Sequence, residues 1–371
     1  MLKIGITGIN GFIGSHLKRW LLLKENKFEI INFNRDYFLD IKKMDSFVNK
    51  CDIIIHLAAI NRNNDEEYLF EKNLSFTKDL VSSFERTNFN GQVIFSSSIQ
   101  ENKENVFGRV KKTCREHFEN WSIKNNGKFT GLIIPNVFGP FGQPYYNSVV
   151  ATFCDQLVKN KKPIIKLDAK LNLIYIDDLV SEIIKNLDKD SKFSLNIKYT
   201  NEFFVSEILK LLNSFSKTYL VNNEIPEFSS KFELNLFNTF RSYIDLKKHF
   251  PVNYINNEDN RGNFVELVRT SVGGQVSFST TKPEITRGNH FHTRKIERFS
   301  VIKGEALIEL RKFNSNNILK FKLSGKTPSF IDMPIWYTHN LKNIGNEELL
   351  TVFWINEPYN SKDPDTYLET V

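Results

Sequence analysis

The chain has 371 residues, which is more than one hydrophobic core usually holds, so its length predicts two domains. Hydrophobic residues make up 40% and charged residues 25% of the chain, as in ordinary folded proteins, and no apolar run approaches the ~20 residues that span a bilayer. The net charge of +7 is scattered without a basic run, so we expect neither a membrane nor nucleic acid as a partner.

The cysteines and the first residues indicate the cellular location. Three widely spaced cysteines are an odd number, which suits reduced thiols better than a disulfide framework. The opening run MLKIGITG is strand-like and has no charged leader of the kind that secreted proteins carry. We therefore expect a cytoplasmic protein, and the 33 phenylalanines predict aromatic-rich cores.

The first half of the chain alternates strand-like and helix-like segments. Short β-branched runs such as KIGITG, DIIIHLAA and QVIFSSS alternate with amphipathic stretches at residues 13–26, 65–88 and 111–125. FEIINFN and FTGLIIPN complete a set of five expected strands. This order is typical of βαβ units around a parallel sheet, so the fold class predicted here is an α/β Rossmann domain.

The pattern of expected secondary structure changes after about residue 251. Short strands separated by Gly, Asn and Pro turns follow, among them GQVSFSTT, ERFSVIKG, EALIELRKF and LLTVFWIN. Such a pattern predicts an all-β barrel. We expect a Rossmann domain with a small substrate-binding part over residues 1–250 and a barrel domain over residues 254–371.

A glycine triplet lies where the first strand turns into the first helix. Gly8 allows the tight turn, Gly11 lets the backbone approach a pyrophosphate, and Gly14 lets helix and strand pack closely. Phe12 and Ile13 begin the helix, whose N-terminus favours negative charge. The triplet predicts a dinucleotide site.

The end of the second strand indicates which dinucleotide binds. Proteins that bind NAD usually carry an acid there, whereas this strand ends in Arg35 followed by Asp36. An arginine can pair with a 2′-phosphate, so NADPH is the expected cofactor and NADH the alternative. An ordinary surface ion pair between the two residues is the other interpretation.

The first half resembles the extended short-chain dehydrogenase/reductases, on the segments TGINGFIG, HLAA, SSS and PNVFGP. The resemblance implies that Leu57, Ala58 and Ala59 line the cofactor cleft. It also implies that a serine of the SSS segment, Ser98 or Ser97, polarises a substrate carbonyl. Lys111 matches the family's lysine, which anchors the nicotinamide ribose.

The family's catalytic tyrosine has no counterpart at its usual position. Four residues before Lys111 the chain carries Phe107, which has no hydroxyl to act as general acid. Tyr145 and Tyr146 follow the GPFGQP turn and either enter the same cleft or serve as aromatic packing. Reduction therefore needs another proton source, such as a serine, water or the substrate.

Histidines and one glutamate form a second constellation in the expected barrel. His290 and His292 are two residues apart on a strand and so face the same side. Together with Glu297 and His339 they make a set of three imidazoles and one carboxylate, which suits zinc, with iron, manganese or nickel as alternatives. The spacing resembles the two cupin motifs, with Trp336 where a glycine is usual.

The RGNH segment (residues 287–290) also resembles metal-free cupin epimerases of nucleotide-linked 4-keto sugars. That resemblance implies that His290 is a catalytic base, so His290 is either a metal ligand or a base. Both readings imply removal of a proton next to a ketone, with the enolate oxygen stabilised by a cation or by hydrogen-bond donors. Tyr337 and Lys295 are candidate proton carriers.

The fusion of the two domains resembles the bacterial capsular polysaccharide UDP-sugar epimerase/reductases. The likeness extends over SSSIQ, YNSVVATFC, IYIDDLV, RGNFVE, GQVS, RGNHFH, YTHN and PDTYLETV. It implies that the cupin inverts C3 of a UDP-2-acetamido-2,6-dideoxy-4-hexulose and that the Rossmann domain reduces C4 with NADPH, towards UDP-N-acetyl-L-fucosamine. A cupin epimerase with a silent reductase domain and a non-catalytic scaffold are the alternatives, and a homodimer is expected by analogy.

Overall fold

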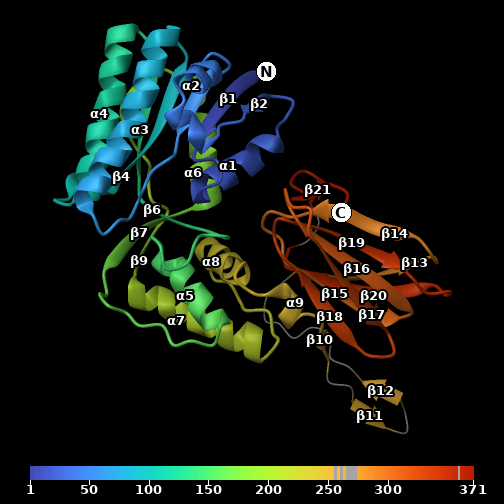
Figure 1. Cartoon of the computed structure of the whole chain (residues 1–371). Coiled ribbons are helices and arrows are strands. Elements are labelled where there is room, and N and C mark those ends of the chain that lie inside the picture. The colour runs from blue at the N-terminus through green and yellow to red at the C-terminus, as the bar shows by residue number, and fades with distance from the viewer. Residues whose placement is uncertain (255–256, 260–261, 265–273, 358–359) are drawn as a thin grey trace. The chain divides into compact units, whose positions relative to one another are not determined.

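The computed structural model describes every residue except 255–256, 260–261, 265–273 and 358–359. The chain forms two compact units (Figure 1): unit 1 comprises residues 1–152 and 165–207, and unit 2 comprises residues 153–164 and 208–371. No helix in the described part of the chain is long and apolar enough to cross a membrane. All three cysteines are buried and free.

Unit 1 is built on a six-stranded parallel sheet in the order β2-β1-β3-β4-β5-β8. Its strands are β1 (Leu2–Thr7), β2 (Phe28–Ile31), β3 (Ile53–His56), β4 (Gln92–Ser98), β5 (Lys128–Ile134) and β8 (Lys192–Asn196). The order changes direction at β1, because β2 lies on one side of β1 and β3 on the other. In such sheets the carboxyl ends of the strands at this reversal form the ligand crevice.

Helices cover both faces of this sheet (Figure 1). Helix α1 lies on one face, where it packs against α6, and α2, α3 and α4 lie on the other, where α3 packs against both α2 and α4. The helices and short helical turns of unit 1 are α1 (Phe12–Leu22), η1 (Arg35–Leu39), α2 (Ile41–Val48), α3 (Glu66–Thr87), η2 (Ile99–Asn102), α4 (Val106–Asn125) and α6 (Ile176–Lys185). A small sheet of β6 (Asn136–Phe138), β7 (Lys170–Tyr175) and β9 (Asn201–Phe204) completes the unit.

Phenylalanine fills the core between the sheet and helices α2 to α4, as the composition predicts. Phe84, Phe118 and Phe129 are almost fully buried there, and their rings contact neighbouring aromatic rings at centroid distances of 4.9 to 6.3 Å. Burying an aromatic side chain of this size removes a large apolar area from water. The phenylalanine excess therefore has a structural explanation.

Helix α4 begins five residues earlier than expected, at Val106 rather than at Lys111. Asn105 caps it, because its side-chain oxygen accepts a hydrogen bond from the Gly108 amide at 2.8 Å. The earlier start brings Phe107 and Lys111 into one helix, one turn apart.

Unit 2 contains a helical part and two five-stranded antiparallel sheets. The helical part has α8 (Lys231–Arg241), α9 (Leu246–His249) and the π-helical turn η3 (Ser216–Val221), while α5 (Val149–Val158) and α7 (Val205–Phe215) have residues in both units. One sheet has the order β10-β18-β15-β20-β13 and the other β17-β16-β19-β14-β21. The strands are β10 (Val252–Asn253), β13 (Gln275–Thr281), β14 (Thr286–Phe291), β15 (Glu297–Lys303), β16 (Glu305–Lys312), β17 (Ile318–Ser324), β18 (Ser329–Met333), β19 (Tyr337–Asn343), β20 (Leu349–Ile355) and β21 (Tyr367–Leu368), beside a hairpin of β11 (Asn257–Asp259) and β12 (Gly262–Phe264).

A buried ion pair lies inside unit 2. Arg298 of β15 donates two hydrogen bonds to Asp332 of β18, at 2.8 and 3.1 Å, and both side chains are almost completely buried. Tyr219 of η3 donates its hydroxyl proton to the same carboxylate, and Arg241 of α8 donates to the Met333 carbonyl at 2.8 Å. These contacts join the helical part of unit 2 to strands β15 and β18.

The predicted fold class is confirmed: a parallel Rossmann sheet precedes an antiparallel region consistent with a cupin barrel. Residues 153–164 and 208–250 group with the barrel strands in unit 2, whereas the expected Rossmann domain range includes them, and the domain ranges stay predictions. The start of a barrel domain at residue 254 stays a prediction. Of the RGNFVE segment, Arg261, Val265 and Glu266 lie outside the described residues.

Candidate functional site

The glycine loop has the geometry that its spacing predicts. Gly8 takes a left-handed φ of 72°, and a Cβ there would lie 2.7 Å from the Ala58 backbone nitrogen. A Cβ on Gly14 would lie 2.3 Å from the Gly8 carbonyl oxygen, and one on Gly11 3.1 Å from the same atom. The loop therefore brings the start of α1 close to β1 and to the residues after β3, as a pyrophosphate site requires.

The segment after β3 is fixed by hydrogen bonds to β1. The amide of Leu57 donates to the Thr7 carbonyl at 3.1 Å, and the Ala58 amide lies 3.3 Å from the Thr7 hydroxyl oxygen. The Thr7 hydroxyl also bonds to Nδ1 of the buried His56 at 2.7 Å. Leu57, Ala58 and Ala59 thus continue from β3 at the crevice edge of the sheet, while their contact with a cofactor stays a prediction.

Lys111 is buried at the end of β4. Its Nζ donates to the Ser96 carbonyl at 2.8 Å and lies 5.0 Å from the centre of the Phe95 ring. Burial lowers the pKa of Lys111 to about 8. An ammonium group with a lowered pKa at this edge fits the role that the family resemblance implies for Lys111.

The two candidate serines occupy different environments. The Ser97 hydroxyl donates to the carboxylate of Glu101, which is itself paired with Arg115 at 3.1 Å. The Ser98 hydroxyl accepts from the Gln100 amide at 3.2 Å and caps η2. The Ser97 proton is therefore used in its hydrogen bond to a buried carboxylate. Ser98 is half-buried, and its hydroxyl proton can still be donated to a substrate.

One of the two tyrosines after the GPFGQP turn, Tyr146, reaches the loop that follows β3. The Tyr146 hydroxyl accepts from the Asn61 amide at 3.2 Å, and Arg62 donates to the Tyr146 carbonyl at 3.4 Å. Tyr145 is half-exposed in a left-handed conformation with a φ of 59°. Tyr146 thus lies beside the segment that continues from Ala58 and Ala59.

Arg35 begins η1 and is exposed. Its neighbour Asp36 pairs with Lys43 at 3.2 Å instead, and no ion pair to Arg35 occurs among the residues that the structure describes. The guanidinium is therefore available to an anionic ligand, and its pairing with a 2′-phosphate stays a prediction.

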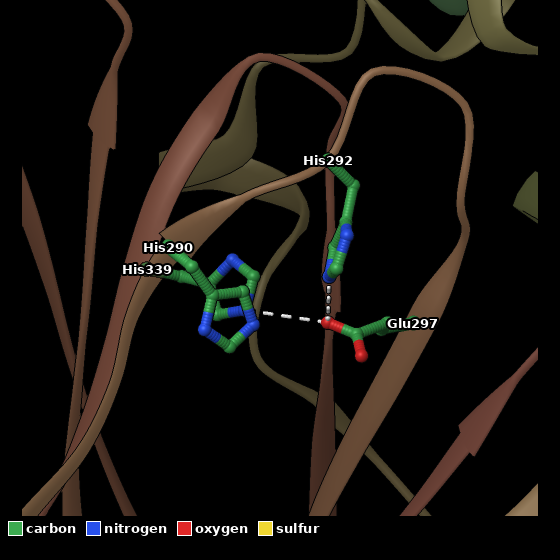
Figure 2. A group of neighbouring side chains, drawn as sticks. All are labelled: His290, His292, Glu297 and His339. Carbon is green, nitrogen blue, oxygen red and sulfur yellow. Dashed lines mark ion pairs between the residues drawn. The ribbon is translucent and has the colours of Figure 1, made fainter. Parts of the chain in front are cut away.

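The four candidate metal ligands meet between the two sheets of unit 2 (Figure 2). His290 on β14 and His339 on β19 come from one sheet, Glu297 on β15 comes from the other, and His292 directly follows β14. One potential ligand atom from each residue lies within 4.8 Å of the others. Nε2 of His292 and Nε2 of His339 lie 3.0 and 3.2 Å from the same Glu297 oxygen.

The chemistry of this cluster fits a divalent metal. Three of its atoms, Nε2 of His292, Nε2 of His339 and Oε2 of Glu297, are buried without a hydrogen bond of good geometry in the described part of the chain. Nδ1 of His292 bonds to the Asp365 carbonyl and Nδ1 of His339 to the Tyr337 carbonyl. Each Nδ1 therefore carries a proton, so Nε2 is the ring nitrogen through which each histidine can bind a metal.

The charge states agree with a metal centre. Burial, together with the neighbouring imidazoles of His339 and His292, lowers the pKa of His290 to about 4, so this ring is neutral at pH 7. Burial alone would raise the pKa of Glu297, but in the absence of a metal the neighbouring imidazoles of His292 and His339 outweigh it and hold that pKa well below its usual range. Burial lowers the pKa of His292, but Glu297 and Asp365 outweigh it and raise that pKa, so a metal that binds Nε2 of His292 would displace a proton there. Neutral imidazole and ionised carboxylate are the forms that ligate metals.

The other predicted residues of the barrel lie around this cluster. Trp336 takes a φ of 60°, which explains why a glycine is usual at this position of the motif. Lys295 is buried and its Nζ donates to the Pro364 carbonyl at 2.7 Å, while Tyr337 is half-buried. Their roles as proton carriers stay predictions.

Residues 4–197 match the sequence profile of the NAD dependent epimerase/dehydratase family. The chain belongs to this family. Residues 257–367 match a second profile, the polysaccharide biosynthesis C-terminal domain. The strand-rich region of this chain is therefore a polysaccharide biosynthesis domain that follows the epimerase/dehydratase domain. The same order of two domains is expected from the family that the sequence resembles.

Two relatives match this family member over almost its whole length, and a third matches its first part. A UDP-2-acetamido-2,6-beta-L-arabino-hexul-4-ose reductase of Pseudomonas aeruginosa is 29% identical, over 99% of this chain and 98% of the relative. The crystal structure of the capsular polysaccharide assembling protein CapF of Staphylococcus aureus is 30% identical, covers 100% of both chains and superposes with a TM-score of 0.63. RMD of Pseudomonas aeruginosa, in complex with NADPH, is 18% identical over 58% of this chain and 83% of its own, with a TM-score of 0.53, and shows the fold alone.

Sequence reasoning missed two residues that the structure brings to the sites. Glu101 binds Ser97, and Asp365 binds the turn after His292. Glu101 lies close to Ser97 along the chain, so it could have been considered. The sequence does not show, however, that Glu101 pairs with Arg115 and is buried there. No local pattern connects Asp365 with His292, because 73 residues separate them.

Proposed function

We propose that this family member is a bifunctional nucleotide-sugar enzyme of surface polysaccharide biosynthesis. The barrel epimerises C3 of a UDP-2-acetamido-2,6-dideoxy-4-hexulose, and the Rossmann domain reduces C4 of the product with NADPH. The observation that carries the proposal is the cluster of His290, His292, Glu297 and His339 in a chain that also holds a dinucleotide loop. The reductase name of the full-length Pseudomonas relative supports the substrate class.

The barrel supplies the groups that proton exchange next to a ketone needs. A divalent metal, with zinc as the proposed ion, would be held by the four residues and would stabilise negative charge on the oxygen at C4. Among the chain's own groups, hydrogen bonds from the two Nδ1–H groups orient His292 and His339. The Phe299 ring lies 6.1 Å from the His339 ring, and Phe353 stacks on Phe299 at 5.2 Å. These two aromatic rings lie on one side of the cluster, and we assign His290 as the fourth ligand and Tyr337 as the proton carrier.

The Rossmann domain supplies the groups that bind and orient a reduced dinucleotide. The glycine loop receives the pyrophosphate, Lys111 holds the ribose and Arg35 receives the 2′-phosphate. NADPH supplies the hydride when it is bound. Ser98 polarises the carbonyl, since its hydroxyl accepts from the Gln100 amide and can donate outward.

One observation favours a second candidate function. Phe107 occupies the helix position of the missing tyrosine, and the centre of its ring lies 5.7 Å from Lys111 Nζ. A phenyl ring cannot protonate the alkoxide that forms at C4. The second candidate is therefore a C3-epimerase whose Rossmann domain binds nucleotide without reduction.

Anaerobic incubation of the protein with NADPH and the UDP-linked 4-keto sugar in D₂O tests both candidates. The bifunctional proposal predicts loss of the NADPH absorbance and a reduced sugar that carries deuterium at C3. Deuterium at C3 without NADPH oxidation would establish the second candidate. Absence of both reactions would refute the enzymatic proposal.

A further inference from the structure

The C-terminal tail of the chain packs beside the metal-ligand cluster. Its strand β21 pairs with β14, so that Leu368 faces His290 and Tyr367 faces Phe291. Asp365 lies two residues before this strand and is only 3% exposed. A nearly buried carboxylate needs partners that offset its desolvation, and the structure shows them.

The Asp365 carboxylate binds the turn that joins two of the candidate ligands. One oxygen accepts from the Thr293 amide at 3.1 Å and from the Thr293 hydroxyl at 2.6 Å. The other accepts from the amides of Arg294 and Lys295 at 3.0 and 3.1 Å. Four donors on residues 293–295 fix the backbone between His292 and Glu297.

The backbone of Asp365 contacts a candidate ligand directly. Its carbonyl oxygen accepts the Nδ1 proton of His292. This bond sets the tautomer of the imidazole and directs Nε2 towards Glu297, 3.0 Å away. One residue thus determines both the path of the chain between two ligands and the orientation of one of them.

Asp365 adopts an unfavourable backbone conformation to make both contacts. Its φ is 42°, in the left-handed region that costs a non-glycine residue free energy. The bonds to the 293–295 turn hold it there. Loss of the carboxylate would release the backbone and move the carbonyl away from His292.

We propose that Asp365 is the positioning residue of the barrel's metal centre, where it holds His292 in the Nδ1–H tautomer with Nε2 directed at the metal. This inference rests on the proposed metal centre. The alternative role is purely structural attachment of the C-terminal tail. Asp363 separates the two roles, because it anchors the same tail through Arg294 at 2.8 Å, is largely exposed and makes none of the contacts to His292.

The test compares the full-length variants Asp365→Asn and Asp363→Asn with the wild type. Each protein is stripped of metal, and its affinity for Co²⁺ is measured by competition with a chromophoric chelator. We expect Asp365→Asn to bind Co²⁺ about 10- to 100-fold more weakly and to show an altered visible spectrum. Asp363→Asn is expected to match the wild type in both. Equal Co²⁺ affinity and spectrum in all three proteins would overturn the proposal.

Two further measurements keep the test decisive. Thr293→Val removes a single donor to the same carboxylate, so it is expected to weaken Co²⁺ binding by an intermediate factor even if Asp365→Asn does not fold. Nitrogen NMR of ¹⁵N-histidine-labelled protein reads the His292 tautomer with or without metal, and His292→Gln assigns its signals. A wild type that binds no Co²⁺ would refute the metal centre, whereas an unchanged His292 tautomer in Asp365→Asn and Thr293→Val would refute the role of Asp365.

Discussion

The ammonium group of Lys111 lies 5.7 Å from the centre of the Phe107 ring, one turn away on α4. The chain thus keeps the family's lysine but lacks the tyrosine hydroxyl that normally accompanies it. Lys111 is therefore the one member of the family's tyrosine and lysine pair that this chain keeps, and its charge can make cofactor binding depend on pH.

Lys111→Met is expected to weaken NADPH binding and to remove its dependence on pH. Burial holds the pKa of Lys111 at about 8, below its usual 10.5, so the ammonium form is lost as the pH rises through 8. Wild-type affinity for NADPH should therefore fall above pH 8, while the variant binds weakly at every pH. Fluorescence titration from pH 6.5 to 9 measures this. The exposed neighbour Lys112→Met is the control and should behave as the wild type does.

The same shift predicts the effect of Lys111 on stability. Since the folded-state pKa is lower than the usual value, the unfolded chain binds more protons between pH 8 and 10.5, and this residue's contribution to stability rises with pH in that window. Below pH 8 the full cost of burying the ammonium applies. Lys111→Met should thus be more stable than the wild type below pH 8, and a less stable variant there would contradict the assignment.

Gly14→Ala should destabilise the fold more than Gly11→Ala. A Cβ on residue 14 would approach the backbone of Gly8 to 2.3 Å and that of Ile9 to 2.8 Å, whereas one on residue 11 stays 3.1 Å from its nearest neighbour. We expect a loss of about 1 to 3 kcal/mol for Gly14→Ala, measured by urea unfolding. Gly11→Ala should instead lose NADPH affinity with little change in stability. The opposite ranking of stabilities would show that the loop geometry is not the constraint.

His339→Ala is expected to abolish metal binding and deuterium exchange while NADPH binding stays unchanged. The variant removes one of two Nε2 atoms that face Glu297. Metal analysis of the purified protein and chelator-dependent loss of thermal stability measure the effect, since a ligand that binds only the folded state raises the melting temperature. His117→Ala, at a half-buried histidine on α4, is the matched control. A full metal complement in His339→Ala would place the metal elsewhere.

Asp332→Asn should be strongly destabilising. It leaves the Arg298 guanidinium buried and without its ionised partner, at a cost of about 3 to 5 kcal/mol. Replacing both residues together, as Arg298→Met with Asp332→Leu, should recover much of that loss. Urea unfolding of both variants decides the point. Glu347→Gln is the control, because it breaks an exposed pair with Lys303 at the end of β15, the strand that carries Arg298, and should have little effect on stability. Equal losses of unfolding free energy in Asp332→Asn and Glu347→Gln would contradict this prediction.

The sites divide into features that local sequence encodes and features that it does not. The glycine loop and the cluster of His290, His292, Glu297 and His339 were predictable, because fixed spacings on adjacent elements determine which residues meet. The start of α4 was predictable in principle from the Asn105 cap. The Arg298–Asp332 pair and the Asp365 contacts join residues 34 and 70 or more positions apart, and only the packing of the sheets and the tail brings them together.

The most direct test of the central claim follows both reactions in a single product. The protein is incubated in D₂O with the UDP-linked 4-keto sugar and NADPH that carries deuterium at C4 of the nicotinamide. If one chain catalyses both reactions, the product carries deuterium at C3, taken from the solvent, and at C4, taken from the cofactor. A sugar labelled at C3 alone, with the labelled NADPH unconsumed, would contradict the claim and leave an epimerase with a silent Rossmann domain.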